Sequence, residues 1–84
     1  MSLSTEHREM LRQIQSLVIS GYEQTGIHIC HSMTTGIYGI DSTVQFMSVD
    51  TPTLHATTSE YLWEYTTLEK QRDELASWIV KNRK

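Results

Sequence analysis

The sequence predicts a small α+β domain in which two helices pack on one face of an antiparallel two- or three-stranded sheet, in the order helix, strands, helix. Apolar side chains recur with helical spacing in the first and last segments of the chain, whereas in the middle segment they alternate with polar ones, as in a strand. With 84 residues, the chain is expected to form a single domain, residues 1–84, with a thin core. The alternative is an all-α hairpin or bundle, in which part of the middle segment is helical.

The first helix is predicted over residues 4–24. On a helical wheel centred on Ile14, a core-facing stripe falls within roughly 60° of that residue. The stripe consists of His7, Met10, Leu11, Leu17, Val18 and Gly21. Ile19 breaks the pattern because it lies about 140° from the stripe, on the polar face. Gly26 offers the left-handed conformation that commonly ends a helix.

The middle segment is predicted to form strands at residues 27–33 and 43–49, with a shorter strand at 37–40. Isoleucine, valine and phenylalanine alternate there with polar residues, which is the period of a strand with one buried face. Residues 34–36 and 41–42 carry turn-forming side chains and are assigned to the connections. The helices would then bury their apolar stripes against one face of this sheet.

The last helix is predicted over residues 58–82, with Thr57 and Glu60 forming a capping box at its start. Its apolar side chains follow a spacing close to a heptad, at Tyr61, Tyr65, Leu68, Leu75 and Ile79. The thin core and this seam together predict a homodimer in which the seams of two chains pair. Trp78 lies near the seam, whereas Trp63 lies about 140° from Leu68, on the charged face of the predicted helix.

Composition limits the classes of protein to which the chain can belong. Cys30 is the single cysteine, which rules out an intrachain disulfide and favours a reducing compartment, so a cytoplasmic location is expected. The sequence has no stretch of about 18 consecutive apolar residues, so no membrane association is expected. The net charge is −3, and lysine and arginine are absent between Arg12 and Lys70. Only the basic end of the last helix could contact phosphates, so nucleic-acid binding is not the expected function.

No motif in the sequence indicates catalysis. The nucleophile elbow, the zinc-protease helix and the glycine-rich phosphate loop are all absent, so we expect no enzyme activity, no catalytic residue and no cofactor. His28, Cys30 and His31 form the one cluster of metal-capable side chains. On a strand His31 points away from the other two, so no metal site is expected. Cys30 is expected to be buried, and His7 to lie at the rim of the core.

The sequence favours a non-catalytic protein–protein interaction module, a small adaptor, inhibitor or regulator that binds a protein partner. Trp63 and Ile19 are the candidate partner-binding residues, since each is a large apolar side chain on the polar face of a predicted helix. One alternative is a nucleic-acid-binding regulator that uses the basic end of the last helix as a dimer. Another is a small enzyme or metal protein whose site is shared between subunits.

Overall fold

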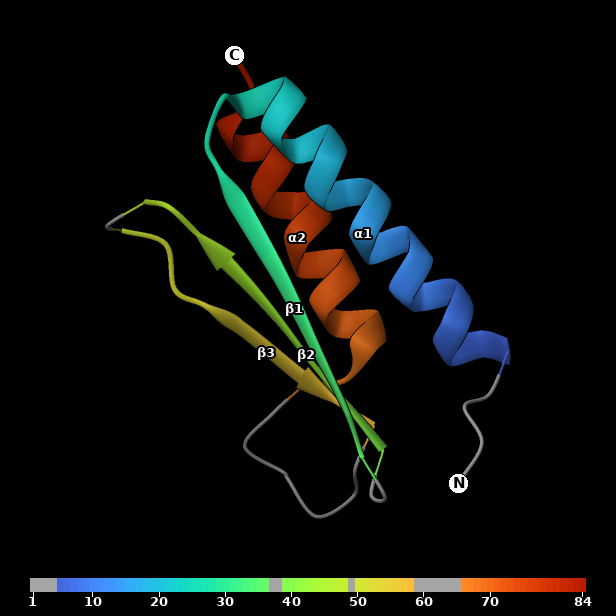
Figure 1. Cartoon of the computed structure of the whole chain (residues 1–84). Helices are drawn as coiled ribbons and strands as arrows, with labels where there is room; N and C mark the ends of the chain where they lie inside the picture. The colour runs from blue at the N-terminus through green and yellow to red at the C-terminus, as the bar shows by residue number, and fades with distance from the viewer. Residues whose placement is uncertain (1–4, 37–38, 49, 59–65) are drawn as a thin grey trace.

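The computed structural model describes residues 5–36, 39–48, 50–58 and 66–84 (Figure 1). The three strands form one antiparallel sheet in the order β1-β2-β3. The α+β prediction, with its order of helix, strands and helix, is confirmed, and the all-α alternative is wrong. In chain order, the elements are α1 (Thr5–Thr25), β1 (Ile29–Gly36), β2 (Gly39–Phe46), β3 (Leu54–Thr57) and α2 (Leu68–Asn82).

Burial alternates along β2 and shows which face of the sheet the helices cover. Ile40, Ser42, Val44 and Phe46 are buried, whereas the residues between them are exposed or half-buried. Their neighbours across the strands, such as His31 opposite Val44, share this helix-facing side. Such alternation is the pattern of an antiparallel sheet whose core lies on one side. The opposite face is polar and carries Cys30, Ser32, Thr34, Asp41, Thr43, Gln45, His55 and Thr57.

The two helices lie side by side and run in the same direction (Figure 1). Arg72 Nη1 of α2 donates to Gln13 Oε1 of α1 at 2.8 Å, and near the other end the Lys84 N–H donates to the Gln24 carbonyl at 3.0 Å. Between these points α1 approaches the sheet closely at Gly21, where an added Cβ would lie 2.7 Å from a side-chain carbon of β1. Neither of these two described helices is both long and apolar enough to cross a bilayer.

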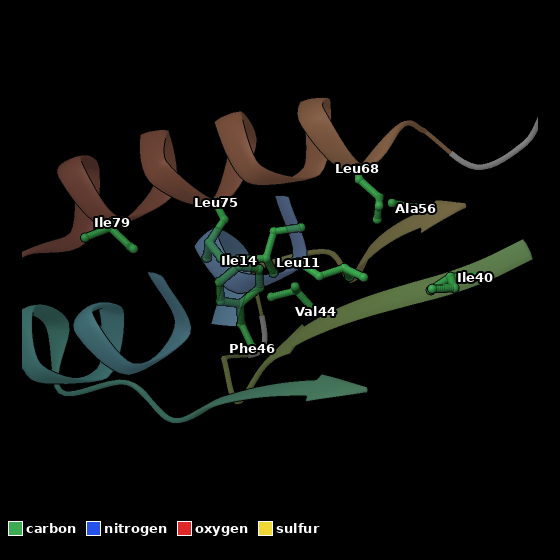
Figure 2. Close-up of a cluster of buried hydrophobic side chains, with 9 residues drawn as sticks. All are labelled: Leu11, Ile14, Ile40, Val44, Phe46, Ala56, Leu68, Leu75 and Ile79. Carbon is green, nitrogen blue, oxygen red and sulfur yellow. The ribbon is translucent and has the colours of Figure 1, made fainter. Parts of the chain in front are cut away.

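The core lies between the helix layer and the covered face of the sheet (Figure 2). Ile14 and Leu75 are fully buried, at 0% exposure, and the predicted stripe of the first helix and the seam residues within α2 face this core. The seam residues within α2 pack inside the domain, whereas the homodimer prediction required them to pair two chains. The formation of a homodimer stays a prediction. The buried side chains of the core are Leu11, Ile14, Ile40, Val44, Phe46, Ala56, Leu68, Leu75 and Ile79.

The strands have different boundaries from those that the sequence indicates. Residues 34–36 lie in β1 and residues 41–42 lie in β2, so the turns predicted there are wrong. Residues 39–46, which include parts of both predicted strands beside the second turn, form one continuous strand. Asp41 fits a strand because its carboxylate accepts a hydrogen bond from Thr57 Oγ1 of the neighbouring strand at 2.7 Å. The sequence predicts no strand at Leu54–Thr57, because four residues are too few to show a period of two.

The last helix begins at Leu68 and not at residue 58. Thr57 belongs to β3, and Glu60, the other residue of the predicted capping box, lies outside the described residues. The run of threonines before the helix suits both caps and strands, because a β-branched side chain with a hydroxyl is favoured in either place. Three residues of the predicted helix, Tyr61, Trp63 and Tyr65, lie outside the described residues.

The segment that enters α2 is attached to the edge of the sheet. Thr66 forms a parallel bridge with Ala56 of β3. Thr67 follows as the N-cap of α2, and its hydroxyl oxygen accepts a hydrogen bond from the Lys70 N–H at 3.2 Å. The start of α2 is therefore fixed both by its cap and by the neighbouring strand.

Candidate interaction surface

The register of the sheet shows which backbone groups of β1 face away from β2. The His28 carbonyl accepts a hydrogen bond from the Met47 N–H at 2.9 Å, so this opposed pair bonds across the strands. In an antiparallel ladder, bonded and non-bonded pairs alternate, so the even-numbered residues of β1 bond to β2. The N–H and C=O groups that point to the outer edge are therefore those of Ile29, His31, Met33 and Thr35.

Contacts on the far side of β2 support the same assignment. Ile40 lies opposite Thr35 in the register. The Ile40 carbonyl accepts from the Thr58 N–H, and the Ile40 N–H donates to Thr58 Oγ1, both at 2.9 Å. Ile40 thus turns its backbone groups away from β1, and the ladder requires Thr35 to turn its own groups away from β2.

The two edges of the sheet differ in how their backbone groups are paired. At the β3 edge, the Thr57 N–H donates to the Thr66 carbonyl at 2.9 Å, and the Thr66 N–H donates to the His55 carbonyl at 3.1 Å. At the β1 edge, no backbone hydrogen bond joins the outward groups to another described residue. The chain entering α2 therefore closes the β3 edge, whereas β1 keeps an open edge within the described part of the chain.

The open edge also lacks the features that usually protect such strands. Soluble proteins blunt exposed edges with lysine, proline, a bulge or a covering segment. β1 is 8 residues long and contains neither proline nor a formally charged side chain. Its pairing with β2 is continuous from Ile29 to Gly36, without a bulge. β1 is therefore a template on which another strand can pair.

Large apolar side chains are exposed on the flank of α1 next to β1. Tyr22 follows Gln13 by two and a half helical turns, so it points about 180° away from the side that contacts α2. Its ring packs edge-on against His28, with centroids 5.0 Å apart, yet 49% of Tyr22 is exposed. Ile19, one turn earlier, is 66% exposed, and Met33 of β1 is 45% exposed. The predicted exposure of Ile19 is confirmed, and its role in binding stays a prediction.

The other predicted site residue, Trp63, lies outside the described residues, so its role also stays a prediction. The wheel that placed Trp63 on a charged face needs a helix that continues back to residue 58. Because α2 begins at Leu68, that argument no longer applies. Sequence analysis missed Tyr22, which lies at the margin of the core stripe, and Met33. The signal that could have found this region is the run of uncharged residues that includes β1.

A buried polar network joins β1 and β2 to α2. Gln71 Nε2 donates to the carbonyls of Ser42, at 2.9 Å, and Leu54, at 2.8 Å, so Gln71 Oε1 is left to face the Ser42 hydroxyl. Ser42 Oγ donates to Gln71 Oε1 at 2.8 Å and lies 2.8 Å from His31 Nε2. Since the single hydroxyl proton is already donated, Ser42 accepts from His31, and the imidazole carries a proton on Nε2.

This arrangement is the reverse of an activated serine nucleophile. A general base must accept the hydroxyl proton, whereas here His31 donates to Ser42. Ser42 is also fully buried, at 0% exposure, beyond the reach of a substrate. Burial lowers the pKa of His31 below its ordinary value, which favours the neutral ring. The network is therefore a structural link between the sheet and α2.

The strand separates the metal-capable side chains, as the sequence indicates. Cys30 pairs with Gln45 on the polar face, and His31 pairs with Val44 on the opposite face. No group of three side chains that could hold a metal ion occurs among the described residues. Cys30 is exposed, so the prediction that it is buried is wrong. Its position on the polar face of an edge strand explains this exposure. His7 is half-buried, as expected for the rim of the core.

The basic end of α2 lies beside the end of α1. Lys81, Arg83 and Lys84 are exposed there, and the Lys84 N–H donates to the Gln24 carbonyl at 3.0 Å. Cations are favourable at this place because two helices direct their C-terminal carbonyls toward it. Helix stability therefore accounts for the basic residues without a phosphate ligand.

The candidate functional site is the β1–α1 surface, which consists of the outward backbone groups of β1 and the exposed side chains of Ile19, Tyr22 and Met33. It combines main-chain groups that can bond to another strand with apolar side chains on one neighbouring helix. Comparisons with known proteins assign the chain to no family: it matches no protein-family model, no curated protein and no solved structure.

Proposed function

We propose that the protein is a non-catalytic interaction module, a small adaptor, inhibitor or regulator, that binds a protein partner through the β1–α1 surface. The observation that carries this proposal is the difference between the two sheet edges. Thr66 occupies the β3 edge, whereas the outward groups of β1 have no backbone partner among the described residues. Such an edge supports binding by strand addition, in which the main chain of the partner supplies much of the affinity.

The side chains around the edge would set the specificity of binding. An added strand alternates its side chains between the two faces of the sheet, next to those of the receiving strand. On the helix-facing side it would lie beside Met33 and near the flank of α1 that carries Ile19 and Tyr22. All three side chains are exposed in the single chain, so association would bury apolar surface as well as form main-chain hydrogen bonds.

Met33→Pro tests this function because the Met33 N–H points away from β2. Proline there removes one outward donor and leaves the hydrogen bonds to β2 in place. Met33→Ala is the matched control, since it removes the same side chain but keeps the N–H. From an extract of the cells that produce the protein, we expect the parent and Met33→Ala to capture the same protein, with any loss in Met33→Ala due to the side chain alone. Met33→Pro should capture at least about tenfold less than Met33→Ala, a loss of about 1.4 kcal/mol of binding that is due to the missing N–H.

The comparison requires that the three proteins have similar unfolding midpoints in urea. If Met33→Pro is unstable, Met33→Lys replaces it, because a lysine on an edge strand opposes strand addition without removing a ladder hydrogen bond. Equal capture by the parent and by the edge variants would contradict binding through β1. Failure of the parent to bind any protein, including a second copy of itself, would contradict the function.

A further inference from the structure

We propose that the partner at the β1 edge is the β1 strand of a second copy of this chain, paired antiparallel about a two-fold axis at Ser32. This inference rests on the proposed function, because it names the partner of the same β1–α1 surface. The dimer contains one continuous sheet to which each copy contributes its three strands. The seam of α2 plays no part in it, because that seam is buried within each chain.

The position of the axis follows from the outward groups of β1. They belong to Ile29, His31, Met33 and Thr35, which are centred on Ser32. An antiparallel partner with its axis at Ser32 places Ile29 opposite the partner's Thr35, and His31 opposite the partner's Met33. In this register every outward N–H and C=O group faces a complementary group of the other copy. A shift of the register by two residues leaves one outward residue of each copy unpaired.

The absence of charge favours a second copy over an unrelated strand. Identical strands repel each other wherever like charges are opposed across the pair. No lysine, arginine, aspartate or glutamate lies between Glu23 and Asp41, a segment that includes all of β1. The strand therefore pairs with itself without like-charge repulsion, and it presents no charge that would select a partner of opposite sign.

The same geometry accounts for the exposed apolar side chains next to β1. An axis perpendicular to the sheet keeps the helices of both copies on one face. The flank of α1 that carries Tyr22 and Ile19 points away from α2, and it therefore faces the α1 helix of the partner subunit. On the same side of the sheet, Met33 lies opposite the partner's His31. Dimer formation thus covers apolar surface that a single copy leaves exposed.

Single cysteines on the polar face of β1 test this register. At the axis, Ser32 and the partner's Ser32 form a non-hydrogen-bonded pair with Cα atoms about 4.5 Å apart, which a disulfide can bridge. Thr34 and the partner's Thr34 lie about 14 Å apart, which a disulfide cannot bridge. Ser32 and Thr34 are both exposed on the same face, so Ser32→Cys and Thr34→Cys, each in a Cys30→Ser background, form a matched pair.

With diamide as the oxidant, we expect the Ser32→Cys protein to form at least about tenfold more disulfide-linked dimer than the Thr34→Cys protein. Sedimentation equilibrium at tens of micromolar should show a dimer for the parent chain and a monomer for Met33→Pro. A monomeric parent, or equal cross-linking of the two cysteine proteins, would overturn the inference.

These outcomes separate the inference from the proposed function. A monomeric parent that captures another protein, and loses it on Met33→Pro substitution, overturns the inference and leaves the function in place. A parent that forms the Ser32-centred dimer and captures no other protein supports the inference, and restricts the function to self-association.

Discussion

Ser42 and Gln71 form two reciprocal hydrogen bonds in the core: the Ser42 hydroxyl donates to Gln71 Oε1 at 2.8 Å, and Gln71 Nε2 donates to the Ser42 carbonyl at 2.9 Å. Both residues are at 0% exposure. A further bond from Gln71 Nε2 to the Leu54 carbonyl, at 2.8 Å, extends the contact from β2 to β3. Among the described residues, no buried side-chain polar atom lacks a partner. One amide therefore fixes the position of α2 on two strands.

Replacement of Gln71 should destabilise the fold through unpaired polar groups. Gln71→Met keeps a side chain of similar volume, so it leaves little cavity, but it removes the partner of the Ser42 hydroxyl and of two carbonyls. Each buried group left without a hydrogen bond costs about 1 to 3 kcal/mol, so we expect a loss of at least about 2 kcal/mol in the free energy of unfolding. Urea denaturation measures this loss.

A double-mutant cycle with Ser42→Ala provides the control. Each single change leaves the other member of the bond between Ser42 Oγ and Gln71 Oε1 without its partner. The double change removes both members, so neither is left unpaired in the core. We therefore expect the double variant to lose less stability than the sum of the single losses. Strictly additive losses would show that the two side chains do not act as a pair.

The stability of the fold should decrease as the pH falls below about 6.5, the ordinary pKa of histidine. Burial lowers the pKa of His31 in the folded protein, while the unfolded chain keeps the ordinary value. Between the two pKa values only the unfolded state binds the proton, so the free energy of unfolding rises with pH in that window. The contribution of neutral His31 to the free energy of unfolding is fully present above the pKa of His31 in the unfolded chain. It decreases as the pH falls toward the pKa of His31 in the folded protein, and it changes no further below that value.

His31→Gln isolates this effect, because glutamine does not titrate but can still donate an N–H to Ser42 Oγ. The difference in unfolding free energy between the parent and His31→Gln should shift in favour of the parent as the pH rises from about 5 to 8. Subtracting the unfolding free energy of His31→Gln from that of the parent cancels the contributions of titrating groups that both proteins share. A difference that is constant with pH would contradict the assignment to His31.

The sequence predicts the fold class and both helices, except for the start of the last one, because their signals are local. The stripe around Ile14 repeats over several turns, and that side chain is fully buried as expected. The sheet boundaries depend on contacts between distant residues. Asp41 looks like a turn former until Thr57 is placed on the neighbouring strand to donate to its carboxylate. Likewise, Gln71 looks like a surface residue until the sheet supplies its partners.

The candidate site is harder to predict, because it depends on pairing. A sequence shows that β1 is uncharged, but only the register shows that the groups of Ile29 and Met33 point outward. Only the bonds of Thr66 show that the other edge is closed. Ile19 could be found from the sequence because a helical wheel needs no tertiary contact.

Leu75 and Val80 of α2 should respond in opposite ways to truncation. Leu75 is at 0% exposure in the core, whereas Val80 is 59% exposed. Leu75→Ala removes buried methyl groups and leaves a cavity, for which we expect a loss of about 2 to 5 kcal/mol. Val80→Ala removes a largely solvated side chain and should change the unfolding free energy by no more than about 0.5 kcal/mol. Similar losses in the two variants, measured in urea, would mean that the buried face of α2 is assigned incorrectly.

Trp78 should matter for folding mainly through its ring. Its centroid lies 4.2 Å from that of Phe46, and its Nε1–H donates to Thr51 Oγ1 at 3.3 Å, which ties the segment after β2 to the helix. Trp78→Ala removes both contacts and should cost about 2 to 4 kcal/mol, because large core aromatics cost about 3 to 5 kcal/mol and Trp78 is only half-buried. Trp78→Phe keeps an aromatic ring against Phe46 and loses the N–H, so it should cost less than about 1.5 kcal/mol. The urea midpoints of the two variants show whether the ring or the N–H of Trp78 contributes more to stability. If Trp78→Phe is as unstable as Trp78→Ala, the hydrogen bond to Thr51, and not the contact with the Phe46 ring, stabilises this end of the core.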